Sequence, residues 1–259
     1  MIDKNYNKLI RNLKFKFTEN DIATKESMGK QYFNAYSNYN IKSFNNVLSR
    51  LKRNNLLTRV SKDKYIFKKT KDIDFKLDLE CEKIYKIIKD EYPLIDISVW
   101  NTEILNKFMI HQVYNNMVIV EVDKLILDSV IPLLKENIGR KYSITLQDIL
   151  EEKQAMYLNS EKILSVKVLI KKSPLNKAKN FSVPKMEKIL VDLFIDKMYI
   201  SYQGQELSNI YEEVISNYNI DFVKLYAYAK RRNKNNEIRK YINKLNVNDV
   251  YKLGDINDR

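Results

Sequence analysis

The hydrophobic and polar positions between residues 41 and 53 repeat with the period of an α-helix. Apolar residues recur three and four positions apart, so a helix gathers them into one stripe. The stripe consists of Ile41, Phe44, Val47, Leu48 and Leu51. At about 3.6 residues per turn, the opposite side receives Lys42, Asn46, Ser49, Arg50 and Arg53. Because that side carries amides, a hydroxyl and cations but no acid, the pattern predicts an amphipathic helix with a basic polar face.

The residues that follow have the pattern of a short hairpin. Asn54-Asn55 is expected to end the helix, since asparagine tolerates the left-handed backbone conformation. Residues 56–60 then read as a strand, residues 61–64 as a polar turn and residues 65–67 as the returning strand. A basic helix that runs directly into a basic-tipped hairpin is the arrangement of a winged helix. An ordinary helix and hairpin without a DNA role is the alternative interpretation.

Two shorter patterns precede this helix. Residues 6–13 indicate a first helix, and residues 17–22 read as an entry segment with a helix start at Thr18 or Asn20. Together with the helix and hairpin, they predict an N-terminal winged helix-turn-helix domain over residues 1–70. Residues 68–76 are polar and carry charges of both signs, so we place the boundary to a second domain there.

Residues 77–259 alternate between short β-rich runs and amphipathic helical patterns. The expected strands are residues 95–100, 118–122, 141–145 and 164–170. The expected helices are residues 79–91, 124–136, 184–195, 206–217, 222–230 and 236–245. Pro184 is expected in the first turn of its helix, where a missing N–H costs nothing. The alternation predicts the α/β (α+β) class, with a mixed-sheet domain after the winged helix and a helical C-terminal cap.

Positive charge is concentrated at the start of the chain. The net charge is +13, and residues 1–72 hold 17 Lys and Arg against 6 Asp and Glu, whereas the remaining residues hold 29 against 27. Such an imbalance indicates a polyanionic partner for the first segment, and double-stranded DNA is the first candidate. A genome rich in Lys codons is the alternative explanation.

The expected DNA contacts lie on the polar face of the helix and on the hairpin. Arginine pairs bidentately with guanine and asparagine with adenine, so Arg50 and Asn46 are expected to read bases. Lysine and serine more often hold phosphate, and Lys42 and Arg53 are expected to position the backbone. The full candidate set is Lys42, Ser43, Asn46, Ser49, Arg50, Arg53, Arg59, Lys62 and Lys64.

A second basic patch lies near the C-terminus. Residues 224–244 hold eight Lys and Arg against the single acid Glu237, with tyrosines interleaved. The residues at its centre are Lys230, Arg231, Arg232 and Lys234. RNA, the DNA backbone and an acidic partner all fit such a patch, and so does a solvated helix face.

Two features argue against familiar catalytic chemistry. His111 is the only histidine, so a histidine-rich metal site cannot be assembled, and a structural role is the preferred interpretation. The four glycines are isolated, which excludes a Walker-type phosphate loop. No catalytic residue, metal site or cofactor is therefore expected, and the chain is not expected to be an enzyme.

Two acidic groupings have structural explanations. Asp96 in one expected strand and Glu121, Asp123 and Lys124 in the next superficially resemble a metal-dependent nuclease site. Neighbouring residues of a strand face opposite sides, so Asp123 and Lys124 would not converge on one ion. On the helix at residues 184–195, Glu187 and Asp192 are expected to be structural, with Asp192 as a buried cap or as the partner of a basic residue.

The composition indicates the expected cellular location of the protein. The single cysteine, Cys81, cannot form an intramolecular disulfide. No apolar run approaches the roughly 20 residues that span a bilayer, and no signal-peptide pattern opens the chain. We therefore expect a cytoplasmic protein that does not bind membranes.

Several motifs together resemble the AbiEi-type antitoxins of abortive-infection, type IV toxin–antitoxin systems. In the first domain the resemblance lies in the helix 43–53, the Asn-Asn-Leu-Leu break at residues 54–57 and the strand 65–67; the family usually has a glycine at this break. In the second domain it lies in the helix motif at residues 183–193 and in residues 97–102, 202–207 and 228–232. These segments are spread over most of the chain.

The resemblance implies a dual role. The winged helix would bind inverted repeats in the promoter of its own operon and repress transcription. The larger domain would counteract a nucleotidyltransferase-like toxin without forming a stable complex with it, although some members lack a toxin. No catalytic residues of the family transfer onto this sequence.

A plasmid replication initiator is one alternative function, although only one of the usual two winged-helix units is visible. A nuclease delivered by a winged helix is another, disfavoured by the misregistered acids.

Overall fold

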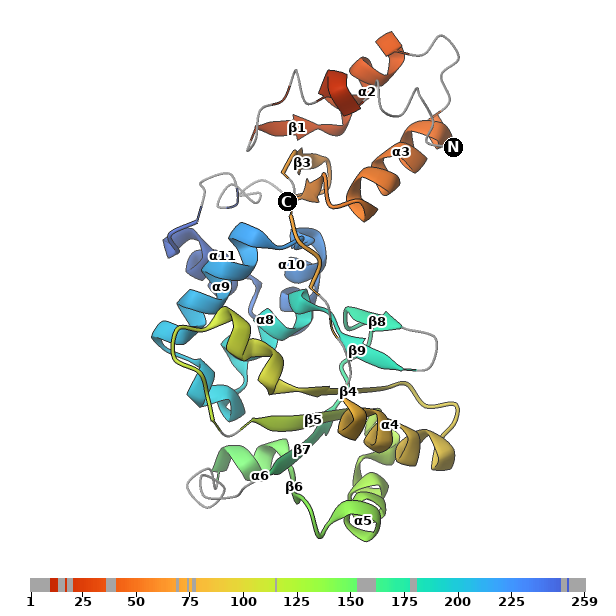
Figure 1. Ribbon diagram of the computed structural model, residues 1–259, viewed down its shortest axis with the longest axis vertical. Coiled ribbons are helices and arrows are strands. Elements are labelled where there is room, and N and C mark those ends of the chain that lie inside the picture. The colour runs from red at the N-terminus through yellow and green to blue at the C-terminus, as the bar shows by residue number, and fades with distance from the viewer. Residues whose placement is uncertain are drawn as a thin grey trace. The chain divides into compact units, whose positions relative to one another are not determined.

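The chain forms two compact units in its computed structural model (Figure 1). Met1–Ile73 and Tyr211–Arg259 make up one unit, here called the terminal unit, and Asp74–Ile210 makes up the central unit. The structure describes residues 10–13, 17, 21–35, 41–68, 70–73, 75, 78–114, 116–152, 162–177, 181–247 and 251. The first division falls in the polar segment 68–76, and the second falls inside a helix. The assignment of domains to residues 1–70 and 77–259 stays a prediction.

The first part of the terminal unit is a small helix–sheet arrangement. Its elements are β1 (Ile22–Thr24), α2 (Lys25–Ala35), α3 (Ile41–Arg53), β2 (Thr58–Arg59) and β3 (Lys64–Ile66). The strands form an antiparallel sheet in the order β1-β3-β2, so β3 pairs with both other strands. Apolar residues of α2, α3 and the sheet pack into one core, which includes Met28, Leu48 and Leu57.

A helix that started at Thr18 or Asn20 would continue through Ile22. Ile22 instead opens a strand, and α2 begins only at Lys25, so this expectation is wrong. Thr18 and Asn20 themselves lie outside the described residues. Thr24 and Ser27 define this start: the Ser27 N–H donates to Oγ1 of Thr24, and the Thr24 N–H donates to Oγ of Ser27, both at 3.0 Å. This reciprocal capping satisfies two N–H groups at the helix end. Of the expected first helix, residues 10–13 are helical and residues 6–9 are not described.

The terminal unit also contains the C-terminal helices. They are α10 (Phe222–Arg231) and α11 (Asn235–Lys244), preceded by α9 (Gln205–Asn217), which crosses the division between the units. The Asp221 carboxylate accepts hydrogen bonds from the N–H groups of Val223 and Lys224 and so caps α10. The helices expected at residues 206–217, 222–230 and 236–245 are therefore confirmed within one residue at each end.

The central unit is built on a four-stranded mixed sheet. Its strands are β4 (Ile97–Asn101), β5 (Met117–Val122), β6 (Ser143–Leu146) and β7 (Ile163–Val168). They lie in the order β4-β5-β7-β6, where β4 is antiparallel to β5 and the other neighbours are parallel. The remaining elements are α4 (Leu79–Glu91), η1 (Thr102–Phe108), η2 (Lys124–Ile126), α5 (Leu127–Ile138), α6 (Gln147–Glu152), β8 (Leu175–Lys177), β9 (Ser182–Pro184), α8 (Met186–Ile195) and η3 (Lys197–Tyr202). The mixed α/β class with C-terminal helices is thus confirmed.

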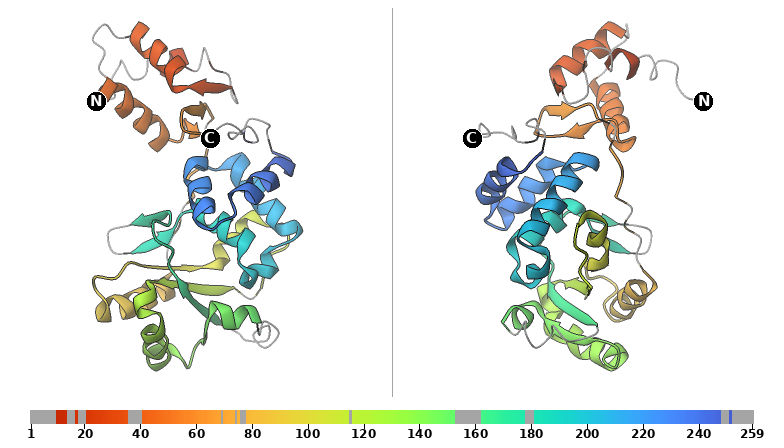
Figure 2. Two further views of the ribbon diagram at one scale, coloured as in Figure 1. Left: turned by 180° about the vertical axis from the view of Figure 1, so that it is seen from behind. Right: turned by 60° about the vertical axis from the view of Figure 1, so that its left-hand side comes forward.

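The two faces of this sheet differ in character because side chains alternate along each strand. One face presents valine, leucine and isoleucine, and α4 and α5 cover it (Figures 1 and 2). On the other face the strand register aligns Ser98, Glu121 and Lys167 in one row across β4, β5 and β7. All three are buried. The sheet therefore buries charge on one side, which the expected strand patterns did not reveal.

Pro184 does not lie in the first turn of a helix, as the sequence suggested. It ends β9 and pairs with Leu175 of β8, and α8 begins two residues later at Met186. Proline lacks the N–H that a strand interior would need, but the end of a two-stranded hairpin tolerates it. The short β8–β9 hairpin was not predicted.

Candidate nucleic-acid interface

Helix α3 separates its residues into a buried and an exposed side. Phe44, Leu48 and Leu51 are buried in the core of the terminal unit, and each contributes roughly 1.5–3 kcal/mol by leaving water. The residues spaced four, three and four positions apart on the opposite side are all exposed, namely Lys42, Asn46, Ser49 and Arg53. We call these four the α3 stripe. It carries cations, an amide and a hydroxyl, and no acid.

Three residues of α3 depart from the simple two-sided pattern. Ile41, expected in the apolar stripe, is 60% exposed, and Val47 is only half-buried. Ile41 is the first residue of the helix, so the core that covers the later turns does not reach it. Arg50, expected to read a base, is half-buried, whereas Arg53 one turn later is exposed. Ser43 is exposed but lies beside the stripe rather than in it.

The end of α3 has the conformation that its asparagines predict. Asn55 has a φ angle of 55°, in the left-handed region, and the Leu56 N–H donates to the Leu51 carbonyl at 3.0 Å. This closes the helix in the manner that usually employs glycine. The expected Asn54-Asn55 break is confirmed, and it sends the chain directly into the hairpin.

Arg59 shapes the tip of the β2–β3 hairpin. Its Nε donates to the Ser61 carbonyl at 3.1 Å and its Nη2 to the Lys62 carbonyl at 2.7 Å. The Asp63 carbonyl accepts the Lys25 N–H at 2.9 Å, which ties the tip to the start of α2. Lys62 is exposed and Lys64 half-buried. Of the three basic residues expected to contact DNA from the hairpin, Lys62 is thus the most accessible.

The C-terminal part of the terminal unit is bonded to the end of α3. The Asn219 side-chain Nδ2 donates to the Lys52 carbonyl at 3.3 Å and to Oδ1 of Asn55 at 2.8 Å. The backbone of Lys71 exchanges two hydrogen bonds with residues 217 and 219, at 2.9 and 3.1 Å. Residues 216–221 therefore join the helix end to the strand-like segment that follows the hairpin.

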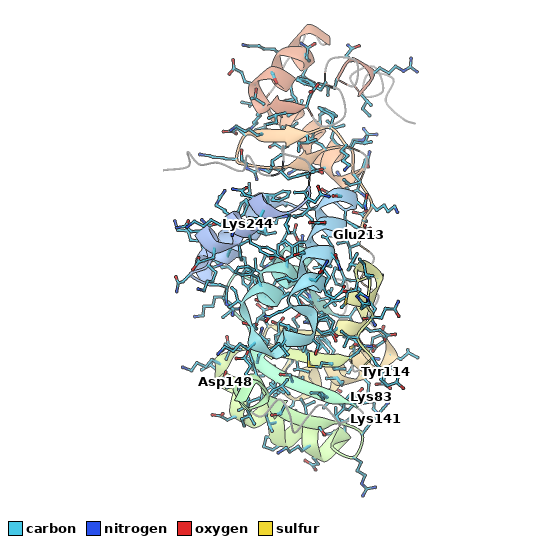
Figure 3. All side chains as sticks on the ribbon, turned by 90° about the vertical axis from the view of Figure 1, so that its left-hand side faces the viewer. Lys83, Tyr114, Lys141, Asp148, Glu213 and Lys244 are labelled. Atoms are coloured by element: carbon cyan, nitrogen blue, oxygen red, sulfur yellow. The ribbon has the colours of Figure 1, made fainter. Side chains whose placement is uncertain are left out.

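The second basic patch surrounds the turn between α10 and α11. Lys230 and Arg231 are exposed, and Arg232 and Lys234 are half-buried. Asn233 closes the turn with a φ angle of 54°, and Lys234 pairs with Glu237 at 3.0 Å. In addition to these four residues, Lys244 at the end of α11 is exposed (Figure 3).

An arginine–tyrosine contact holds α11 against α10 beside this patch. The Arg239 guanidinium lies 3.7 Å from the centre of the Tyr226 ring. Burial raises the pKa of Tyr226 to about 12, and the nearby Arg239 opposes that rise. Arg239 thus packs within the unit as well as adding charge to it.

The two units differ more in net charge than the first 72 residues differ from the rest of the chain. The terminal unit holds 27 Lys and Arg against 13 Asp and Glu, whereas the central unit holds 19 against 20. Of the nine arginines, eight belong to the terminal unit, and Arg140 is the exception. The guanidinium group is the cation best suited to phosphate and base edges, so the terminal unit is the candidate nucleic-acid interface.

In the central unit the charged residues of the sheet form a buried ionic cluster. It consists of Glu121, Lys167, Lys188, Asp192 and Asp196, and each side chain is at most 4% exposed. Lys188 pairs with Glu121 and, at 2.5 Å, with Asp192. Lys167 pairs with Asp196 at 2.5 Å and with Asp192 at 3.6 Å. The expectation that Asp192 is the buried partner of a basic residue is confirmed.

The pKa values in this cluster follow from burial and mutual charge. Burial by itself lowers the pKa of Lys167, but Asp192, Asp196 and Glu121 outweigh it, so the pKa is raised and the ammonium stays charged. Burial raises the pKa of the Tyr199 hydroxyl well above its usual value, and the same three carboxylates raise it further. Sequence reasoning missed Lys167, Lys188 and Asp196; the signal was the Lys188–Asp192 spacing within an otherwise apolar helix.

The acids that resemble a nuclease site do not come together. Asp96 pairs with Lys177 at 2.9 Å on the surface, and the Asp123 carboxylate accepts the Leu125 N–H at 3.0 Å, while Glu121 lies in the buried ionic cluster. His111 is exposed, and its Nδ1 lies 2.7 Å from the Glu206 carboxylate. Within the described ranges, no three His, Cys, Asp or Glu side chains are placed to hold a metal ion. None of the described helices combines the length and apolar character of a membrane span.

These observations define a mixed α/β protein whose basic residues gather on a helix–hairpin unit. The chain belongs to a protein family of unknown function, DUF6577, whose model matches residues 43–248. No curated protein matches the chain. The match includes most of α3, the hairpin, the central unit and the C-terminal helices, so it extends over parts of both units.

Proposed function

We propose that this protein is a sequence-specific DNA-binding transcriptional repressor whose α3 enters the major groove as the recognition helix of a winged helix-turn-helix. The exposed, acid-free α3 stripe is the observation that carries the proposal. The order β1-α2-α3-β2-β3, with a hairpin directly after α3, supports it. In such a domain the hairpin is the wing, which lies along the DNA backbone.

The dimensions of the stripe fit a DNA half-site. Lys42 and Arg53 are eleven residues apart, which corresponds to about 16 Å at roughly 1.5 Å per residue. That length covers about five base pairs at about 3.4 Å each. Asn46, near the middle, has the two-sided amide that reads adenine, while Lys42 and Arg53 at the ends suit phosphates. Two copies on one duplex would recognise inverted repeats about one helical turn apart, the kind of operator that the resemblance to AbiEi-type antitoxins implies.

The proposal extends to an antitoxin role for residues 77–259, which would counteract a nucleotidyltransferase-like toxin. Its support is the sequence resemblance alone. The motif at residues 183–193 includes most of β9 and most of α8, and Lys188 and Asp192 within it belong to the buried ionic cluster. These motif residues therefore maintain the core, and a toxin-directed surface would have to lie elsewhere. Co-expression with the neighbouring open reading frame, scored by growth, tests this role.

The DNA-binding role is tested by fluorescence anisotropy of the full chain on its own promoter and on a scrambled duplex of equal length. We expect tighter binding to the promoter and a loss of about 1–3 kcal/mol for Asn46→Ala on the promoter only. Asn137→Ala, an exposed asparagine on α5, is the matched control and should change neither affinity. Equal binding of the wild type to both duplexes would exclude sequence-specific recognition.

A further inference from the structure

The basic residues of α10 begin where those of α3 end. Lys52, in the last turn of α3, is half-buried, and its pKa is lowered by burial, with Asp221 opposing and the cations Arg59 and Lys224 adding to the shift. Lys224 stands in the first turn of α10, five residues after Asn219, whose side chain is bonded to the end of α3. The hydrogen bonds from Asn219 to Lys52 and Asn55 therefore bring the start of α10 near the end of α3.

From that junction the exposed residues follow one side of α10 and continue onto α11. On α10 the exposed positions are Lys224, Ala227, Lys230 and Arg231. On α11 they include Asn236, Lys240 and Lys244, while Ile238 and Ile242 are buried beneath. The small side chain of Ala227 leaves room between the cations. Exposed acid on these two helices is confined to Glu237, which Lys234 neutralises.

Helix stability alone does not account for this placement. Cations in the last turn of a helix, such as Lys230 and Arg231, interact favourably with the helix dipole. Lys224 stands in the first turn, where the dipole disfavours a cation, and Lys240 stands in the middle of α11. The ion pair of Lys224 with Asp221, at 3.5 Å, offsets part of this cost. The common property of these residues is a solvent-facing positive charge.

We infer that the exposed basic side of α10 and α11 is a second DNA-backbone contact, continuous with α3 and separate from base recognition. The inference rests on the proposed function and deepens it: the C-terminal helices hold phosphates beside the half-site that α3 reads. Charge complementarity favours this occupant, because long cationic side chains carry the exposed charge of the patch, and such side chains suit phosphates. It also assigns the patch to DNA rather than to the antitoxin role.

The test compares two triple variants of the full chain that remove the same charge. Lys224→Gln/Lys230→Gln/Lys240→Gln changes the patch, and Lys83→Gln/Lys86→Gln/Lys135→Gln changes exposed lysines of α4 and α5 in the central unit. Affinity for promoter DNA is measured across a salt series. Each phosphate contact contributes about −0.9 to the slope of log K against log salt concentration. We expect the patch variant to flatten the slope by about 2–3, with the ratio of promoter to scrambled affinity unchanged.

The outcomes separate this inference from the proposed function. The central-unit variant should keep the wild-type slope, and thermal unfolding of both variants should match the wild type because all six lysines are exposed. If both variants have the wild-type slope while Asn46→Ala still weakens promoter binding, the patch is a solvated face and the inference is overturned. If the patch variant loses the promoter preference itself, the patch reads sequence and is not a backbone contact. If the wild type does not prefer its promoter, the proposed function fails.

Discussion

The two units use lysine and acidic residues in opposite ways. In the central unit, Lys167 and Lys188 are buried among three carboxylates, and basic and acidic residues nearly balance. In the terminal unit, basic residues outnumber acids by 27 to 13, and the charged members of the α3 stripe are exposed. The residue types are similar, but the charges of the ionic cluster are buried and paired, whereas those of the α3 stripe are exposed.

The difference has a physical basis. A buried charge must be paired, because removing it from water without a partner costs several kcal/mol. An exposed charge can stay unbalanced at little cost, and a group of them creates a field that attracts an anionic partner. Buried, balanced charge therefore indicates a structural role, and exposed, unbalanced charge indicates a surface for a partner. This comparison can be tested in both units.

The largest expected effect comes from Lys188→Met in the central unit. Methionine keeps most of the side-chain volume but removes the charge that Glu121 and Asp192 share, so the three buried carboxylates of the cluster are left with Lys167 alone. We expect a loss of about 3–5 kcal/mol in the free energy of unfolding, measured by urea denaturation. Lys86→Met, exposed on α4, is the control and should stay within about 0.5 kcal/mol. A loss below 1 kcal/mol at Lys188 would mean that the cluster admits water and is not sealed.

An intermediate effect is expected for Arg53→Gln, compared with Arg140→Gln. Both arginines are exposed, but Arg53 lies in the α3 stripe and Arg140 is the single arginine of the central unit. If Arg53 holds a phosphate, its replacement weakens binding to every duplex by about 1 kcal/mol and flattens the salt slope by about 1. Arg140→Gln should change neither quantity. Equal effects of the two variants would show that binding follows overall charge rather than the stripe.

Local patterns predicted the elements of this fold better than its interactions across the chain. The helices at residues 41–53 and 79–91 match prediction residue for residue, because strong amphipathic periodicity and clear end signals bound them. The β1 strand and the β8–β9 hairpin, whose strands have three residues each, were not predicted. The apolar stretch around β9 and α8 led Pro184 to be assigned to the helix.

The contacts at the candidate nucleic-acid interface and in the ionic cluster were also predictable only where they follow from a local pattern. The polar side of α3 follows from helical spacing alone, and all four residues of the α3 stripe were singled out in advance. The bonds of Asn219 to Lys52 and Asn55 join residues more than 160 positions apart, which no local pattern contains. The buried ionic cluster likewise assembles Glu121 of β5, Lys167 of β7 and Asp196, which follows α8. Arg59 was expected at the DNA, but its hydrogen bonds to the hairpin tip depend on the turn geometry.

The smallest expected effect concerns Glu80, a carboxylate at the surface of the central unit. It accepts hydrogen bonds from Lys141 and Tyr142, and Lys162 lies at 3.3 Å. The hydrogen bond from Lys141, and then that from Tyr142, lowers the pKa of Glu80 to about 2. Since the folded-state pKa lies below the unfolded value, the stabilisation is present above about pH 4.5 and is lost as the pH falls toward 2.

Glu80→Gln should therefore narrow the difference in unfolding free energy between pH 6 and pH 3. The change should be below about 1 kcal/mol, because the side chain is 38% exposed and solvent screens such pairs. Glu91→Gln, exposed at the end of α4, is the control and should leave the difference unchanged. If Glu80→Gln loses as much stability on acidification as the wild type, the contacts of Glu80 contribute nothing measurable. Ion pairs would then stabilise the central unit only where they are buried. The contrast between the two units would rest on the buried ionic cluster alone.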